Sequence, residues 1–385
     1  TFRRPLGVFV ADEIGLGKTI TAILAVKRLM DSGLAKRVLI LVPRILVKQW
    51  LLELERFGFA PTRIERGNFR FLAERGFGGG VYVASLDLAK RPRYAKQLAS
   101  VDWDVLVVDE AHRLSLPKSG KPTLRLAFAA EVAAKPERHV LLLSATPHKG
   151  DPRDYLNRLL LLDPSLRRDF RALDRPDFYA LTRNVLIFRR TKIDVNSAYE
   201  DEEVFPGCRI IATVVPATPE ESEFHVRLVR FLRTKILDYH REVGTEPKAL
   251  GLLNALIFKR ASSSPYAAVK TMEVILERRA KALSLMRGDL DRFERMLSRQ
   301  SRLAHALLGL GFEEYESELD PDKAVEEFAE TCSALLTERD IEELKGLIEL
   351  ARECMERDSR LSAVLHLVSQ HVSNGEKVIV FTEFK

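Results

Sequence analysis

The residues best suited to chemistry lie near the start of the chain, in a glycine-containing segment that ends in lysine and threonine. Gly15 and Gly17 allow the backbone to turn its N–H groups towards a polyphosphate, and the N-terminus of a following helix favours negative charge. Lys18 can reach the β- and γ-phosphates, and the Thr19 hydroxyl can ligate Mg²⁺. We therefore predict a nucleotide-binding segment made of Asp12, Glu13, Ile14, Gly15, Leu16, Gly17, Lys18 and Thr19.

This segment departs from the strict phosphate-loop pattern at one position, because Asp12 stands where the first glycine is expected. The alternative interpretation is an ordinary glycine-rich turn between a strand and a helix. The Lys-Thr pair that follows, in a strand–loop–helix context, favours the phosphate loop.

Two adjacent carboxylates, Asp109 and Glu110, follow an apolar run at residues 105–108. A buried strand that ends in two charges is costly unless those charges have a role. We predict that Asp109 holds Mg²⁺, directly or through water, and that Glu110 orients and deprotonates the attacking water. Together with Lys18 they form the predicted catalytic set.

A third motif, made of Ser144, Ala145 and Thr146, follows the apolar run at residues 140–143 and precedes Pro147. Taken alone it would be a turn whose hydroxyls cap local backbone groups. Beside the other two motifs, it is predicted to report the phosphate state to a second surface. His112 is predicted to join this coupling network, although a lone histidine is more often structural.

The elements that must position these residues alternate in type along the first part of the chain. Expected strands lie at residues 8–11, 38–42, 81–85, 105–108 and 140–143, and expected helices at 18–30, 45–57, 93–98 and 124–134. Strands that are apolar throughout suit a parallel sheet covered on both faces. The predicted fold is a doubly wound, RecA-like α/β lobe, with its ligands at the carboxyl ends of the strands.

The rest of the chain is mostly helical in pattern. A strand is expected at 210–215, then helices at 220–241, 266–286, 290–308, 324–336, 341–355 and 361–372, then a strand at 377–381. The predicted domains are a first lobe at 1–216, a helical protrusion and linker at 217–372, and the first strand of a second lobe at 373–385. Because the chain starts at Thr1 and stops after a strand-like run, both ends are expected to be cut.

Composition narrows the function classes. Hydrophobic residues make up 46% of the chain and charged residues 30%, a composition that excludes a predominantly disordered protein. No apolar run approaches the roughly 20 residues of a membrane helix. Three scattered cysteines suit a reducing cytosol rather than disulfides or zinc. A formal net charge of +6 permits a polyanionic partner without establishing one.

The motifs, in this order and spacing, resemble the first lobe of a superfamily-two helicase-like ATPase of the Swi/Snf class. The similar segments are residues 12–20, the Asp-Glu-Ala-His box at 109–112, the Ser-Ala-Thr-Pro-His run at 144–148, and residues 43–50 and 187–195. Residues 258–265 resemble a motif of the bacterial RapA/HepA-like branch. Residues 358–361 and 375–384 are similar to the entry into the second lobe.

The resemblance implies ATP and Mg²⁺ as cofactors, and double-stranded DNA as partner. It implies DNA contacts by Pro43, Arg44, Lys48, Gln49 and Ser85. Trp50 ends the same motif, but its large ring is at least as suited to a core as to a contact. RNA polymerase or another DNA-bound machine is a further possible partner, in a prokaryotic, nucleoid-associated cytoplasmic setting.

The family also places its arginine fingers in the second lobe. An arginine finger contributes about 10³–10⁵ in rate, so this segment by itself is expected to turn over poorly. The leading hypothesis is an ATP-driven translocase on duplex DNA. The alternatives are a strand-separating DEAH-type helicase on RNA or DNA, and a non-hydrolysing, ATP-gated scaffold.

Overall fold

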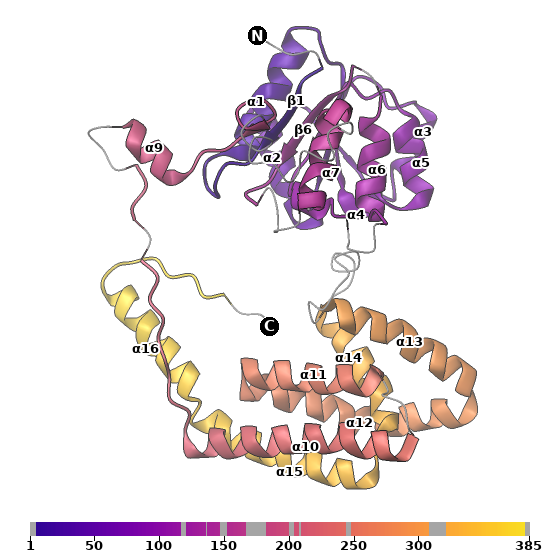
Figure 1. Ribbon diagram of the computed structural model, residues 1–385, viewed down its shortest axis with the longest axis vertical. Helices are drawn as coiled ribbons and strands as arrows, with labels where there is room; N and C mark the ends of the chain where they lie inside the picture. The colour runs from indigo at the N-terminus through magenta and orange to yellow at the C-terminus, as the bar shows by residue number, and fades with distance from the viewer. Residues whose placement is uncertain are drawn as a thin grey trace. The chain divides into compact units, whose positions relative to one another are not determined.

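The computed structural model describes residues 5–116, 121–135, 137–146, 152–166, 182–199, 204–207, 209–243, 248–307 and 321–381. The chain divides into two compact units, Thr1–Cys208 and Arg209–Lys385 (Figure 1). Each unit has its own hydrophobic core.

The first unit is built on a seven-stranded sheet in the order β3-β4-β2-β5-β6-β1-β7, and every neighbouring pair is parallel. The strands are β1 (Gly7–Val10), β2 (Arg37–Val42), β3 (Thr62–Ile64), β4 (Gly80–Ser85), β5 (Val105–Val108), β6 (His139–Leu143) and β7 (Ile187–Phe188). All five strands expected in the first 150 residues are present, to within one residue at each end. The short strands β3 and β7 lie at the two edges and were not expected.

Helices cover both faces of this sheet. Helices α1 (Lys18–Asp31) and α2 (Val47–Arg56) pack on one face, and α3 (Phe69–Glu74), α4 (Leu86–Ala89), α5 (Pro92–Ser100), α6 (Leu124–Ala133) and α7 (Pro152–Leu162) pack on the other. In β2, Leu39 and Leu41 face the α3–α7 side, whereas Ile40 faces α1 and α2. Both faces of a strand are buried in this arrangement, which is why the strands are apolar at every position. The predicted RecA-like α/β fold is confirmed.

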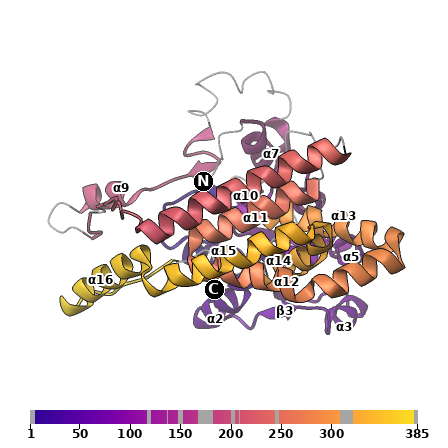
Figure 2. The same cartoon turned by 90° about the horizontal axis from the view of Figure 1, so that it is seen from below.

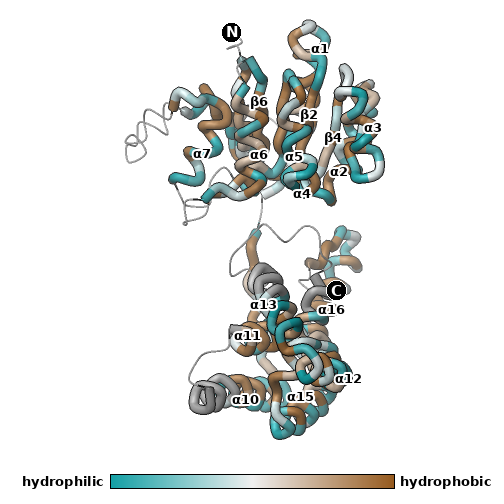
Figure 3. Tube along the Cα trace, turned by 90° about the vertical axis from the view of Figure 1, so that its right-hand side faces the viewer, coloured by the Kyte–Doolittle hydropathy of each residue, from teal (hydrophilic) through white to brown (hydrophobic). Residues whose placement is uncertain are grey.

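The second unit is a group of helices. They are α10 (Pro219–Val243), α11 (Lys248–Ser263), α12 (Pro265–Gly288), α13 (Leu290–Leu307), α14 (Pro321–Cys332), α15 (Glu338–Glu356) and α16 (Ser359–Ser373). Figure 2 shows α10, α11 and α15 running side by side. One apolar stripe of α10 is buried in the core of this unit, at Phe224, Leu228, Phe231 and Leu232. In Figure 3 the helices alternate between hydrophobic and hydrophilic colours along their turns, as amphipathic helices do.

Two expected strands are wrong. Residues 210–215 form no strand, and Ile210 and Val214 are about nine-tenths exposed. These residues belong to the second compact unit, Arg209–Lys385. The last strand of the first unit is instead β7, which is followed by a short helix, α9 (Lys192–Ala198). Residues 377–381 also form no strand, since the described part of the chain offers them no partner strand, and Phe381 is exposed.

Of the helices in the described ranges, none is both long and apolar enough to cross a bilayer. Cys332 and Cys354 are free and buried, and burial raises the pKa of both thiols. They are therefore inert core residues, and Cys208 lies outside the described residues.

Candidate active site

The sheet order brings the three motifs to one edge. Strand β6 lies between β5 and β1, so the segments that follow these strands are neighbours at their carboxyl ends. The backbone ladder continues into the motifs: the N–H of Asp109 donates to Leu41 O at 2.9 Å, and the N–H of Ser144 donates to Val10 O at 3.2 Å. The predicted phosphate loop, the carboxylates of Asp109 and Glu110, and the segment 144–146 are therefore neighbours in one site.

The predicted phosphate loop connects β1 to α1 and has the backbone that its glycines permit. Gly15 and Gly17 have φ values of 90° and 77°, in the left-handed region that other residues rarely adopt. A β-carbon on Gly17 would meet no atom within 4 Å, so the loop is open on that side. The Lys18 ammonium donates to the carbonyl oxygens of Asp12 at 2.9 Å and Glu13 at 3.3 Å. It is thereby held over the loop, where phosphate oxygens can replace these carbonyls.

The side chains of Asp12 and Glu13 are engaged within the chain rather than turned towards a ligand. Asp12 is 1% exposed and pairs with Arg190, which donates its backbone N–H at 2.8 Å and its guanidinium at 2.5 Å. Glu13 accepts the backbone N–H of Lys192 at 2.8 Å. Both carboxylates therefore tie the phosphate loop to the segment after β7. Only the backbone groups of Asp12 and Glu13 therefore remain available for the predicted binding of a nucleotide.

The Arg190→Ala substitution should destabilise the first unit. It leaves the buried Asp12 carboxylate with a backbone donor only, and an under-satisfied buried acceptor costs about 1–3 kcal/mol. Because the Arg190 side chain is 58% exposed, water can replace part of this bond, and we expect about 1 kcal/mol. Urea unfolding followed by circular dichroism measures the loss. Arg189→Ala, at the exposed neighbouring residue, is the matched control, and equal losses in both variants would contradict the role assigned to the pair.

The carboxylate of Asp109 lies at the bottom of the site, where it is 6% exposed. One oxygen, Oδ2, accepts the indole N–H of Trp50 at 2.8 Å, and the other, Oδ1, accepts the backbone N–H of Glu110 at 2.8 Å. Burial raises the pKa of Asp109, while the hydrogen bond from Trp50 works against this increase. A buried carboxylate that accepts these two hydrogen bonds from neutral N–H groups is well suited to a cation.

Glu110 has a backbone conformation that is uncommon for a residue with a β-carbon. Its φ is 50°, and strain of this kind is often found at functional sites. The carboxylate is partly exposed, and its Oε2 lies 3.0 Å from His112 Nδ1. The hydrogen bond from His112 lowers the pKa of Glu110, so the carboxylate is ionised at neutral pH. A charged, accessible carboxylate beside the phosphate loop can accept a hydrogen bond from water.

The predicted coupling residues form one hydrogen-bonded group. His112 Nδ1 lies 3.1 Å from Ser144 Oγ, and the backbone N–H of Thr146 donates to that same oxygen at 3.2 Å. Ser144 is fully buried, whereas Thr146 is exposed. Ala145 connects Ser144 to Thr146 through the backbone, and Pro147 lies outside the described residues. The arrangement links Glu110, through His112, to the segment after β6, which is the connection a coupling role requires.

The donor groups of the site fit one Mg²⁺ ion shared with a nucleotide. Within the described ranges there is no group of three His, Cys, Asp or Glu residues that could hold a metal alone. Mg²⁺ usually keeps several waters and binds through one or two protein oxygens plus substrate phosphates. Asp109 and the Thr19 hydroxyl, at the start of α1, would supply those oxygens.

The residues expected to contact DNA divide into two kinds. All three of Arg44, Lys48 and Gln49 are exposed near the carboxyl end of β2: Arg44 lies in the 3₁₀ turn before α2, and the other two lie in the first turn of α2. Pro43 is buried where a 3₁₀ turn begins, and the Ser85 hydroxyl accepts the N–H of Leu88 at 3.2 Å to cap α4. These last two residues have structural roles here, so the exposed trio carries the prediction of DNA contact.

Two features of the site were not predicted from the sequence. One is Arg190 as the partner of Asp12, and the other is Trp50 as the hydrogen-bond donor to Asp109. Trp50 is 1% exposed and lies in the core between α1, α2 and the sheet, which decides between the two interpretations of its ring. Nothing in the sequence paired it with Asp109. Arg190 belonged to a motif of the resemblance, but no local signal gave it a partner.

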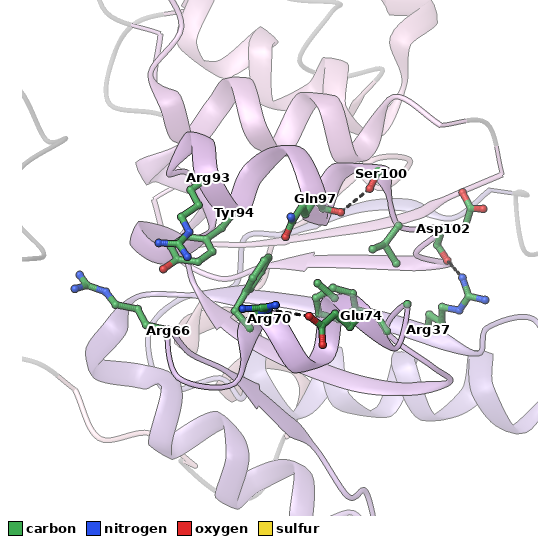
Figure 4. A pocket seen from close by; sticks show the side chains of 14 residues that line it. Arg37, Arg66, Arg70, Glu74, Arg93, Tyr94, Gln97, Ser100 and Asp102 are labelled. Carbon is green, nitrogen blue, oxygen red and sulfur yellow. Dashed lines mark hydrogen bonds and ion pairs between the residues drawn. The ribbon is translucent and has the colours of Figure 1, made fainter.

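A separate cavity of about 780 Å³ lies between α3 and α5 and contains none of the motif residues (Figure 4). Charged side chains of both signs line it: Arg37, Arg66, Arg70, Glu74, Arg93 and Asp102. Its carboxylates are already paired, since Glu74 binds Arg70 at 2.8 Å and Asp102 binds Lys135. The cavity is distinct from the site at the strand ends.

Comparison with known proteins agrees with this geometry. Residues 3–178 match the SNF2-related domain. The chain is 36% identical to the RNA polymerase-associated protein RapA of Vibrio atlanticus over 220 residues, 53% of this chain and 22% of that protein. It is 38% identical to RapA of Pectobacterium carotovorum over 176 residues, 42% of this chain and 17% of that protein. The chain spans about a fifth of the length of these relatives.

Solved structures also resemble the chain. The SWI2/SNF2 ATPase core of Sulfolobus solfataricus, in complex with double-stranded DNA, has a TM-score of 0.43 and 18% identity, covering 72% of this chain and 61% of that one. The helicase domain of Hef from Pyrococcus furiosus has a TM-score of 0.42 and 17% identity, and the match covers 96% of this chain and 71% of that one.

Fold, site and sequence similarity together point to one class. The match of residues 3–178 to the SNF2-related domain and the similarity to RapA support a Swi/Snf-class, helicase-like protein. Within that class it is similar to the RapA-like branch, as its motifs indicated.

Proposed function

We propose that this chain is part of a motor that couples ATP hydrolysis to movement on double-stranded DNA, or to displacement of proteins bound there. The observation that carries the proposal is the convergence of Lys18, Asp109 and Glu110 at one sheet edge, beside the exposed side chains of α2. Strand β2 is the direct neighbour of β5, so the ends of these two strands place the DNA-contact candidates next to the carboxylates. ATP and Mg²⁺ are the proposed cofactors.

Each of these residues has a separate role in the proposed reaction. Lys18 and the loop N–H groups would bind the phosphates, and Asp109 with Thr19 would hold Mg²⁺, which supplies charge neutralisation when bound. Glu110 would orient the water and accept its proton. His112 and Ser144 would pass the state of Glu110 to the segment after β6.

RNA polymerase is a proposed partner, because the RapA relatives are RNA polymerase-associated proteins by name. Such a motor would work in the bacterial cytoplasm, at the nucleoid. The isolated chain should hydrolyse ATP weakly if, as the resemblance implies, the arginine fingers belong to a second lobe.

The discriminating experiment measures ATP hydrolysis by the full-length protein without nucleic acid, then with duplex DNA, single-stranded DNA or RNA, at one stated salt concentration. The proposal predicts the largest stimulation by duplex DNA. Stimulation by single strands or RNA alone would favour a strand-separating helicase, and absence of hydrolysis in every condition would favour an ATP-gated scaffold.

The Lys48→Ala substitution should weaken DNA stimulation and spare basal hydrolysis, because Lys48 is exposed on the outer face of α2. Removing one phosphate contact lowers affinity uniformly across sequences and reduces the magnitude of the slope of log affinity against log salt by about 1. The measurement is the DNA concentration for half-maximal stimulation at several salt concentrations. Arg56→Ala is the matched control, at an exposed cation at the other end of α2. Equal salt slopes in Lys48→Ala and the unsubstituted protein would count against a DNA contact at this position.

A further inference from the structure

Trp50 is the physical link between the outer surface of α2 and the carboxylate expected to hold Mg²⁺. Its ring is 1% exposed, and its indole N–H reaches Asp109 Oδ2 at 2.8 Å. The indole nitrogen can only donate a hydrogen bond. A buried donor aimed at a carboxylate gives a strong, directional contact, so the position of the ring and that of the carboxylate depend on each other.

Trp50 lies on the same short helix as the candidate DNA contacts. Lys48 and Gln49 are exposed and directly precede it, while Val47, Trp50 and Leu54 face the core. A helix of this length moves as one body, because its backbone hydrogen bonds hold its residues in register. A ligand that shifts the outer face of α2 must therefore shift the indole too.

The hydrogen bonds of Asp109 show what such a shift would change. Its Oδ1 is held by the N–H of Glu110 on its own chain segment, whereas Oδ2 is held by Trp50 from another helix. The bond from Trp50 is thus the contact that α2 can alter. Groups that hydrogen-bond a metal-binding carboxylate orient it, and their loss typically costs 10–100-fold in metal affinity.

We propose that Trp50 is a positioning residue that transmits occupancy of the outer face of α2 to the Asp109 carboxylate, and so adjusts Mg²⁺–nucleotide binding when DNA is bound. This inference rests on the proposed function, since it takes duplex DNA as the ligand of α2. Trp50 touches neither DNA nor nucleotide in this role.

The chain provides a matched control, because its second tryptophan is equally buried and also donates its indole N–H, but to a group outside the site. Trp103 is 2% exposed and donates its indole N–H at 2.8 Å to a backbone carbonyl, that of Leu98. It packs in the core on the opposite face of the sheet, against Phe77 and Tyr82. Trp50→Phe and Trp103→Phe therefore remove equivalent groups, and only the first breaks a bond to the site.

The first test compares these variants by titrating Mg²⁺ into protein mixed with a fluorescent ATP analogue. We expect Trp50→Phe to raise the Mg²⁺ concentration for half-maximal binding about tenfold, and Trp103→Phe to leave it unchanged. In the full-length protein, Trp50→Phe should also lose most of the stimulation of hydrolysis by duplex DNA. Unchanged Mg²⁺ dependence and unchanged stimulation in Trp50→Phe would overturn the inference.

The second test needs no folded variant at position 50. In the 385-residue chain the two tryptophans give two indole N–H signals in a ¹⁵N NMR spectrum, and either single substitution assigns both. The Trp50 signal should shift on addition of Mg²⁺ with a non-hydrolysable ATP analogue, and shift again with duplex DNA, while Trp103 stays in place. A Trp50 signal that ignores DNA would overturn the inference. If DNA fails to stimulate hydrolysis by the unsubstituted full-length protein, the proposed function itself has failed.

Discussion

Replacement of Glu110 by glutamine should stop ATP hydrolysis while leaving Mg²⁺-dependent nucleotide binding intact. The substitution keeps the size and hydrogen-bonding shape of the side chain but removes its ability to accept a proton. A positioned general base contributes about 10²–10⁴ in rate, so hydrolysis should fall by at least 100-fold. The geometry supports this size of effect, because the ionised carboxylate is accessible and is held by His112 at 3.0 Å.

Phosphate release measures the first half of this expectation, and equilibrium binding of a fluorescent ATP analogue measures the second. Glu131→Gln, at an exposed carboxylate on α6, is the control for a nonspecific charge effect. Asp109→Asn gives a useful contrast, since it should weaken Mg²⁺-dependent binding as well. Hydrolysis that survives in Glu110→Gln would show that another residue positions the water.

The Lys18→Ala substitution should weaken nucleotide binding by about 100-fold. Hydrogen bonds to charged groups contribute about 1.5–3 kcal/mol each, and the upper value corresponds to two factors of ten in affinity. In the structure the ammonium spans the loop by donating to Asp12 O and Glu13 O. Its loss therefore removes both the cation that meets the phosphates and a contact that shapes the loop.

Binding of a fluorescent ATP analogue is again the measurement, with circular dichroism to confirm that the variant is folded. Lys27→Ala is the matched control: Lys27 lies on the same helix α1, is 45% exposed, pairs with Asp31 at 3.6 Å and lies over the ring of Phe59, away from the predicted phosphate loop. Tight nucleotide binding by a folded Lys18→Ala protein would refute the assignment of the phosphate loop.

Much of the first unit could be predicted because its strands are short, apolar runs that end in polar motifs. The pattern at residues 105–108 indicated a buried strand, and Asp109 and Glu110 directly after it had to lie at a strand end. The same pattern failed at residues 210–215. An apolar, β-branched run becomes a strand only where another strand is within reach, and none is there in the described structure.

The sequence by itself predicted the parallel α/β fold of the first unit. It also predicted that a glycine-containing loop, a pair of carboxylates and two hydroxyl side chains lie at the ends of its strands. These features depend on local patterns, since strands, turns and helix starts follow from residues close together in the chain. Only the tertiary structure decided which side chains meet inside the site. Asp12 pairs with Arg190 across 178 positions, and Trp50 with Asp109 across 59. Such contacts depend on the order of strands in the sheet, which no local pattern specifies.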